Sequence, residues 1–509
     1  MQVGKSASRQ VGKWVMGAGV VLAVQFFADV RMAAYTLVVA MALVLVWGLG
    51  ARCQGPGRAF GLWLWALSLV IFAGLAACQW LPLVALLPET TRASMTLHDA
   101  AAWSLPWRYL VGLLLADHGG FHEWMTYVSV GILVWTVVGV RTLWRQWERR
   151  WLVGWLVSLL VGAAWFSLGG NGGLFQVLWR VVPGLGLLRV PPRAWVLVVF
   201  AMAVLAGLGV EGAEEQRSRG AREQRNRKWR QVGRWLRLGV GMFPPLLVAG
   251  YWLLVGVPPL NVVMFGVVLP GSVGLVLWAD GRGSRKQEAG RWWVGVGAVL
   301  LIALDLLVVD ATLVEARSPE EVFADGRAAA EWLAAQPGRF RVYSPSYSIP
   351  QHVAELYGLE LADGVDPLQL RVYADYLTRA AGLESQGYSV TLPPFPEEAD
   401  VRTALKDAVP DAEMLGWLGV RYVAAAFPIA DDRLQPVGRF DGVYVYQNEE
   451  AQPVADTGWG GGIVLADGTV LFRYRPWAVY AGWAVSGATV VGLLAGWLVS
   501  WLRKRRADG

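Results

Sequence analysis

The sequence predicts a polytopic α-helical membrane protein with a separate α/β domain before its last helix. The 509 residues are 55% hydrophobic and 17% charged, whereas soluble domains carry about 25% charged residues. Ten stretches approach or exceed the roughly 20 apolar residues that a helix needs to cross a bilayer core. The segment 311–475 contains no such stretch, and it carries 13 basic and 24 acidic residues although the whole chain has a net charge of +6.

The expected spans divide the chain into three parts. Residues 1–310 are expected to form a membrane bundle of nine transmembrane helices, 311–475 the α/β domain, and 476–509 the last helix with a basic tail. The ten apolar stretches cover about 13–28, 33–50, 60–80, 124–140, 151–168, 194–210, 238–256, 261–279, 292–310 and 476–501.

Lysine and arginine between the stretches predict the orientation. Six segments on one side of the bundle, the two ends of the chain included, carry 26 basic residues, whereas the connections on the other side carry only 6. Because cytoplasmic loops accumulate these residues, we expect both termini in the cytoplasm and 311–475 outside. The basic loop 211–237 is expected to lie near anionic lipid, and nucleic acid is not a predicted partner.

Local signals in 311–475 predict an α/β fold. Ser318-Pro-Glu-Glu321 has the pattern of a capping box and predicts a helix that continues to about Gln336. Asp366-Pro367 is expected to cap a further helix, and Phe340, Val342, Tyr422 and Val423 are expected inside. The other expected elements are a helix over 412–418, strands over 340–343, 421–426 and 442–447, and a hairpin over 463–474 with an Asp-Gly turn.

A short connection joins the first two expected spans and contains Asp29 and Arg31. On the outer face, the carboxylate of Asp29 could act as a catalytic base, and Arg31 beside it could bind a phosphate. The alternative is an ion pair that caps the two helices at the membrane interface.

The outer connection 81–123 contains three of the four histidines, His98, His118 and His122, and Asp117 is its best candidate for a catalytic acid or base. Histidines beside carboxylates can bind a metal. The spacing does not fit a helix face and there is no cysteine partner, so we predict neither a metal site nor a cofactor.

Arg189-Val-Pro-Pro-Arg193 lies just before the sixth expected span, on the outer side. The two prolines hold the backbone extended. Paired arginines suit bidentate recognition of phosphate. Anchoring at the interface is the alternative.

Asp305 lies inside the ninth expected span, with Asp310 near its outer end. A carboxylate within a span is costly and usually faces the bundle interior or a wet cavity, so we predict that Asp305 contributes to ligand binding. An outer-loop arginine, a hydroxyl or water is its expected partner, and a structural, hydrogen-bonded aspartic acid is the alternative. No Walker A motif, dinucleotide loop or zinc spacing is present.

Several stretches, taken in order, resemble the bacterial YfhO-like family of multispanning envelope proteins. The stretches that carry this resemblance are 24–35, 77–82, 127–130, 187–193, 304–306, 339–343, 364–373, 418–423 and 472–476. They include Leu188-Arg189-Val-Pro-Pro-Arg193, which is similar to the family's FRxPxR signature. Asp29 and Arg31 stand where the family has His and Gln.

The resemblance implies a GT-C-like bundle in the bacterial inner membrane. It implies a glycosyltransferase that moves a sugar from a polyprenyl-phosphate donor to an envelope polymer or glycan acceptor outside the cell. Asp29 and Asp117 would be catalytic, and Arg31, Arg189, Arg193 and Asp305 would bind the ligand.

The family has further spans and a catalytic carboxylate ahead of position 1, so a shortened, inactive chain is one expectation. A non-catalytic scaffold for envelope assembly, or a transporter of a lipid-linked substrate, is the alternative function.

Overall fold

The computed structural model describes twelve stretches of the chain, and these form two compact units. The described residues are 17–49, 56–116, 120–147, 149–182, 184–219, 259–281, 292–384, 387–395, 399–454, 462–464, 470–473 and 476–508. We call residues 1–69 and 97–315 the helical unit, and residues 70–96 and 316–509 the mixed unit.

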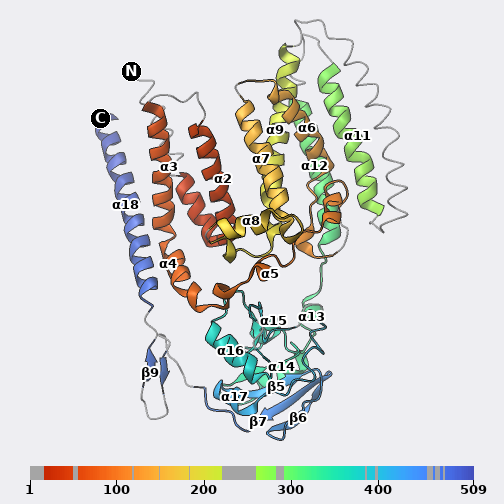
Figure 1. The fold of residues 1–509 in the computed structure, drawn as a ribbon, viewed down its shortest axis with the longest axis vertical. Helices are drawn as coiled ribbons and strands as arrows, with labels where there is room; N and C mark the ends of the chain where they lie inside the picture. The colour runs from red at the N-terminus through yellow and green to blue at the C-terminus, as the bar shows by residue number, and fades with distance from the viewer. Residues whose placement is uncertain are drawn as a thin grey trace. The chain divides into compact units, whose positions relative to one another are not determined.

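Long apolar helices build the helical unit (Figure 1). α9 packs against α6 and α7, and α11 packs against α6 and α12. The helices are one over Gly17–Ala28, then α2 (Val30–Leu49), the first part of α3 (Pro56–Leu75), α5 (Leu97–Ala100), α6 (Val130–Trp144), α7 (Arg150–Ser167), α8 (Leu174–Val181), α9 (Trp195–Arg219), α11 (Pro259–Gly281) and α12 (Trp292–Leu313).

Glycine permits the close approach of α6 and α9. A Cβ atom at Gly139 would collide with the carbonyl oxygen of Leu205, and one at Gly209 with that of Trp135. Small residues at such crossings let helix backbones pack closely in an apolar medium, where burial supplies little driving force.

Several described helices are suited to crossing a membrane. Five are long and apolar enough: Arg150–Ser167, Pro191–Gly212, Leu260–Trp278, Trp293–Leu313 and Trp477–Arg503. The pair Leu62–Leu75 and Ala77–Glu89, bent by 71°, makes a sixth if it is one span, and Gly17–Ala28, Val30–Val44 and Val130–Trp144 are apolar but shorter. The expected span 238–256 lies outside the described residues. The described helices indicate a multispanning helical protein, with five or six full-length spans where ten were expected.

One expected span begins later than its composition indicated. The fourth was expected over about 124–140, but α6 begins at Val130. Ser129 is its N-cap, and the side chain accepts a hydrogen bond from the backbone N–H of Gly131 at 3.2 Å.

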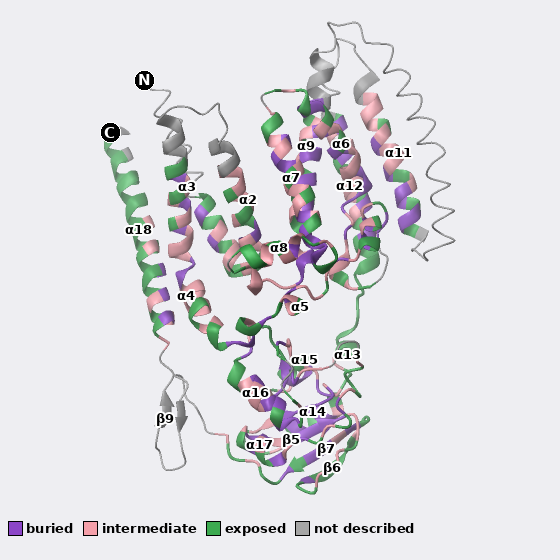
Figure 2. Cartoon of the chain, viewed as in Figure 1, coloured by how far each residue is buried: buried purple, intermediate pink, exposed green. Residues whose placement is uncertain are grey.

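In the mixed unit, α18 (Trp477–Asp508) packs along α4 (Ala77–Leu86) at the bend after α3. Ser486 Oγ lies 2.9 Å from the carbonyl oxygen of Leu75 and 3.1 Å from that of Gly74, and it accepts the N–H of Cys78 at 3.0 Å. The rest of α18 is mostly exposed (Figure 2). The hydroxyl therefore partners backbone groups that the break in the helix would leave unpaired.

A five-stranded mixed sheet forms the α/β part of the mixed unit. The strand order is β2-β1-β5-β7-β6, with β1 parallel to β2 and β5, and β7 antiparallel to β5 and β6. The strands are β1 (Arg341–Tyr343), β2 (Glu360–Leu361), β5 (Val420–Ala425), β6 (Leu434–Phe440) and β7 (Val443–Asn448). Two smaller pairs are β3 (Gly364–Val365) with β4 (Thr391–Leu392), and β8 (Gly462–Val464) with β9 (Val470–Arg473).

Helices cover both faces of this sheet, because alternate strand residues point to opposite faces. Val342 and Tyr422 pack with α14 (Arg327–Ala334) and α15 (Gln351–Leu356). Tyr343 and Val423 pack with α16 (Arg371–Ala380) and α17 (Ala412–Trp417). Strands β1, β5 and β7 are mostly buried, whereas the edge strand β6 is mostly exposed (Figure 2).

Most local predictions for 311–475 are confirmed. The capping box at Ser318 and Glu321 is present, and Val342, Tyr422 and Val423 are buried while Phe340 is partly buried. The structure also contains the expected short helix α17 and the pairing of β8 with β9.

Three details of these predictions are wrong. The first helix is interrupted: α13 (Pro319–Val322) ends, and α14 begins only after Gly326, whose φ of 72° is left-handed. Asp366 accepts the N–H of Leu368 and does not cap α16. Strand β6 was missed because Pro436 lies within it, which an edge strand tolerates.

Candidate functional site

Asp29 joins the helix over Gly17–Ala28 to α2, and its carboxylate is held by Arg31. Arg31 donates Nε at 3.1 Å to Oδ1 and a terminal nitrogen at 2.8 Å to Oδ2. The backbone N–H groups of Arg31 and Met32 donate to Oδ1 at 2.8 and 3.3 Å. The Arg31 side-chain bond first, and these backbone bonds after it, lower the pKa of Asp29 to about 2.

Glu123 and Arg193 form a second pair, from segments that are 70 residues apart in the chain. Arg193 donates Nε at 2.9 Å to both carboxylate oxygens and a terminal nitrogen at 2.6 Å to Oε1. Both side chains are partly buried, with 24% of Arg193 and 17% of Glu123 exposed. His122 lies 4.0 Å from the same carboxylate and is 81% exposed.

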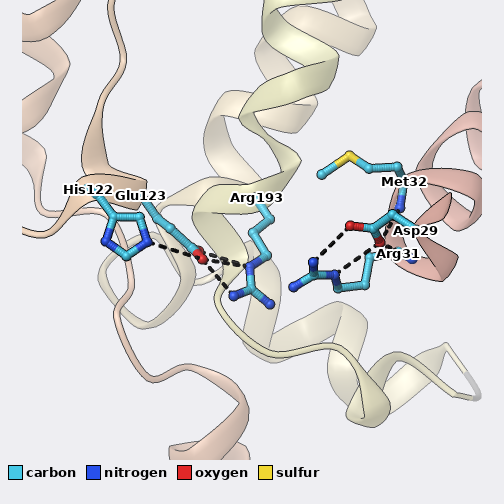
Figure 3. Close-up of polar contacts among 6 residues, drawn as sticks. All are labelled: Asp29, Arg31, Met32, His122, Glu123 and Arg193. Atoms are coloured by element: carbon cyan, nitrogen blue, oxygen red, sulfur yellow. Dashed lines mark hydrogen bonds and ion pairs between the residues drawn. The ribbon is translucent and has the colours of Figure 1, made fainter. Parts of the chain in front are cut away.

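The two pairs face each other in the helical unit, and we call Asp29, Arg31, Glu123 and Arg193 the ion cluster. The guanidinium groups of Arg31 and Arg193 point toward one another (Figure 3). The charge of Glu123 also acts on Arg31, and the buried phenol of Tyr35 lies in the field of all four side chains. The sequence predicted Asp29, Arg31 and Arg193 as site residues, and the structure brings these three together.

Backbone strain marks the segment that carries Arg193. Val190 has φ of 62°, a left-handed conformation that is a rare outlier for a β-branched residue. It is the N-cap of the 3-10 turn Pro191–Ala194, and it is buried. Strained residues persist where their surroundings hold them, often at functional sites. The half-buried Arg189 directly precedes Val190.

Asp305 has a different partner. It is fully buried in α12, and Tyr127 donates its hydroxyl to Oδ2 at 2.7 Å. The hydroxyl partner expected from the sequence as one of three alternatives is therefore confirmed. Asp117 lies outside the described residues, and Asp310 is exposed at the end of α12.

Phe121 and Trp124, close to Glu123 in the chain, belong to a cluster of aromatic rings. Trp103 stacks on Phe121 with ring centroids 4.4 Å apart, and Trp124 lies 5.8 Å from Phe121. Trp103 is 49% exposed.

Within the described ranges, no group of three or more His, Cys, Asp or Glu side chains is placed to hold a metal ion. His98 lies on the short helix α5, and His122 belongs to the turn His122–Trp124.

Sequence reasoning did not select Glu123 or Tyr127 as site residues. Glu123 was visible as an acid in the histidine-containing connection, but its partner Arg193 is distant in sequence. Tyr127 precedes the N-cap of α6. Only tertiary structure brings either residue to its partner.

No protein-family model, curated protein or solved structure matches this chain. The resemblance to the YfhO-like family therefore stays a prediction from sequence motifs.

Proposed function

We propose that this chain is an integral-membrane glycosyltransferase of the bacterial cell envelope. Its ion cluster would bind the phosphate of a polyprenyl-phosphate sugar on the outer side of the membrane. The proposal includes a ten-span bundle with both termini in the cytoplasm and 311–475 outside. The excess of basic residues on one side of the bundle supports this orientation.

The facing guanidinium groups are the observation that carries the proposal (Figure 3). Each guanidinium has five N–H donors. The carboxylate bonds of Arg31 and Arg193 use Nε and one terminal nitrogen of each. N–H groups on both side chains thus remain to donate to phosphate oxygens, while the carboxylates hold the guanidinium planes in place.

The chemistry assigns different tasks to the two carboxylates. Asp29, with its low pKa, is a weak base and positions Arg31. Glu123 would take the proton of the acceptor hydroxyl as that oxygen bonds to the anomeric carbon. The bond from that carbon to the donor phosphate breaks, and Arg31 and Arg193 hold the departing polyprenyl phosphate. The aromatic cluster of Trp103, Phe121 and Trp124 would contact the acceptor.

Binding of a radiolabelled polyprenyl phosphate to the purified full-length protein tests the site. Arg193→Ala should weaken binding about tenfold or more, since charge-assisted hydrogen bonds are lost. Arg180→Ala is the matched control, because Arg180 is exposed at the end of α8. Equal affinity in both variants would reject the phosphate role.

A transfer assay in proteoliposomes separates binding from chemistry. Glu123→Gln should retain the bound lipid and lose transfer of a labelled sugar from the polyprenyl-phosphate donor to a glycan acceptor. Transfer by this variant at the wild-type rate would remove Glu123 from the mechanism.

A non-catalytic scaffold is the second candidate, because each arginine already has a carboxylate, as a structural ion pair requires. The exchange Arg193→Glu with Glu123→Arg preserves the pair but relocates the guanidinium. Under the scaffold alternative, the exchange restores the stability lost in Arg193→Ala, and the wild type binds no polyprenyl phosphate. Under our proposal, stability returns without full lipid affinity.

A further inference from the structure

The carboxyl group of Asp305 is buried, and only one of its two oxygens has a hydrogen-bond partner. Its side chain has no exposed surface, and Tyr127 donates to only one of its oxygens. The other oxygen, Oδ1, is buried without a hydrogen-bond partner. An ionised carboxylate in an apolar interior is costly unless it is paired or coordinates a cation.

A second unpartnered oxygen belongs to the same neighbourhood. Ser272 on α11 is fully buried, and its Oγ has no hydrogen-bond partner. A Cβ atom placed on Gly131 would lie 3.2 Å from Ser272 Oγ, 3.4 Å from Ser129 Oγ and 2.9 Å from Ile302. Ile302 precedes Asp305 by about one turn of α12. Gly131 therefore adjoins Ser272 of α11, Ser129 and a residue of α12 that lies about one turn from Asp305.

The segment before α6 holds its residues in a strained conformation. Ser129 is fully buried with φ of 74°, and it lies two residues after Tyr127. A non-glycine residue with positive φ is uncommon, and the surrounding packing must maintain it. The strained turn places the hydroxyl groups of Tyr127 and Ser129 in the buried interior of the helical unit, where Asp305 also lies.

Among the described helices, the two that carry Asp305 and Ser272 contain no positively charged residue. Neither α11 nor α12 contains a lysine or arginine within its bounds, and the basic residue Arg141 of α6 is in that helix's last turn. Tyr127 contributes a donor but no charge. One carboxylate among neutral oxygens matches the charge of one monovalent cation, and oxygen ligands suit hard cations.

We propose that Asp305 Oδ1, Ser272 Oγ and the hydroxyl oxygen of Tyr127 bind a sodium ion inside the helical unit. The ion would neutralise Asp305 and join α11, α12 and the segment before α6. This site is separate from the ion cluster, and it does not depend on the proposed sugar transfer.

Thermal unfolding of the purified full-length protein in detergent tests the proposal. The melting temperature should rise saturably as sodium chloride replaces choline chloride at constant ionic strength, since an ion that binds the folded state stabilises it. Asp305→Asn should abolish this response. Asp310→Asn, at an exposed position of the same helix, should retain it.

Ser272→Ala keeps the test valid if Asp305→Asn does not fold. It should raise the sodium concentration at half-saturation about tenfold and leave the melting temperature in choline chloride nearly unchanged. Equal melting temperatures of the wild type in the two salts from pH 5 to 9 would overturn the proposal. A rise on acidification without dependence on sodium would also overturn it, because a proton would then neutralise Asp305.

Discussion

Two aspartates, one in each unit, are almost fully buried, but different groups hold them. Asp305 lies within an apolar helix at 0% exposure, and the hydroxyl of Tyr127 is its donor. Asp363 follows β2 at 6% exposure, and the backbone N–H of Ser344 is its donor at 2.8 Å. In both, the second carboxylate oxygen has no hydrogen-bond partner. The comparison shows that two almost fully buried carboxyl groups can differ in the group that donates a hydrogen bond to them.

The donor decides how each site can change. The N–H of Ser344 belongs to the backbone directly after β1, so substitutions other than proline retain it. Tyr127 can be replaced. Burial raises the pKa of Asp363 to about 7, so that residue can become neutral by taking up a proton near neutral pH.

Asp363→Asn should give the largest effect, and the effect should depend on pH. The pKa of Asp363 is raised from 3.8 to about 7 in the folded state. The unfolded chain therefore ionises first, and stability falls as pH rises from about 4 to 7. Asparagine carries no charge, so the variant should gain about 2–3 kcal/mol relative to the wild type between pH 5 and pH 8.

Chemical denaturation of both proteins at pH 5 and pH 8 measures this difference. Asp366→Asn, at an exposed residue three positions away, serves as the control and should show no comparable dependence. A stability difference between Asp363→Asn and wild type that is the same at both pH values would show that Asp363 titrates normally.

Tyr127→Phe should give the next largest effect. It removes the donor to a buried carboxylate, which should cost about 1–3 kcal/mol of unfolding free energy. Tyr347→Phe is the matched deletion in the mixed unit, because Tyr347 donates to the neutral carbonyl oxygen of Gly364. Its cost should be smaller, since bonds to charged groups are stronger.

Measurements of the unfolding free energy of Tyr127→Phe and Tyr347→Phe, made in parallel, show which hydroxyl contributes more to stability. In the Asp305→Asn background, Tyr127→Phe should cost less than it does in the wild type. Equal costs of Tyr127→Phe in both backgrounds would mean that the hydroxyl does not stabilise the Asp305 carboxylate.

Gly131→Ala should give the smallest effect, a loss of about 1 kcal/mol. The new methyl group would press on Ile302 and approach Ser272 and Ser129. Gly154→Ala on α7 is the control, because nothing lies within 4 Å of a Cβ at that position. Melting temperatures of the two variants provide the measurement. If the melting temperature of Gly154→Ala falls as much as that of Gly131→Ala, the effect comes from replacing glycine by alanine and not from contact with Ile302.

The sequence predicted elements where local signals act. The capping box at Ser318 and the alternation around Val342 and Tyr422 require only neighbouring residues, and the structure confirms them. The break at Gly326 was missed because a glycine within a helical pattern does not by itself reveal a left-handed φ. Edge strand β6 was missed because a proline argues against a strand until its edge position is known.

The pairing within the ion cluster was predictable only where the paired residues are close together in the sequence. The arginines were recognisable because outer connections are usually poor in basic residues. Asp29 and Arg31 are two residues apart, so their pairing could be anticipated as an alternative. The pairing of Glu123 with Arg193 and of Tyr127 with Asp305 depends on how helices pack, which a single sequence does not reveal.

The hydroxyl of Ser486 has a consequence for biosynthesis. It partners the backbone of Gly74, Leu75 and Cys78, and its bond to Cys78 joins residues 408 positions apart. At translation rates of roughly 5–20 residues per second, the ribosome needs about 20–80 s to make the chain between them. The bend between α3 and α4 must wait that long for its partner, so the nascent chain completes this part of its fold only when its last helix arrives.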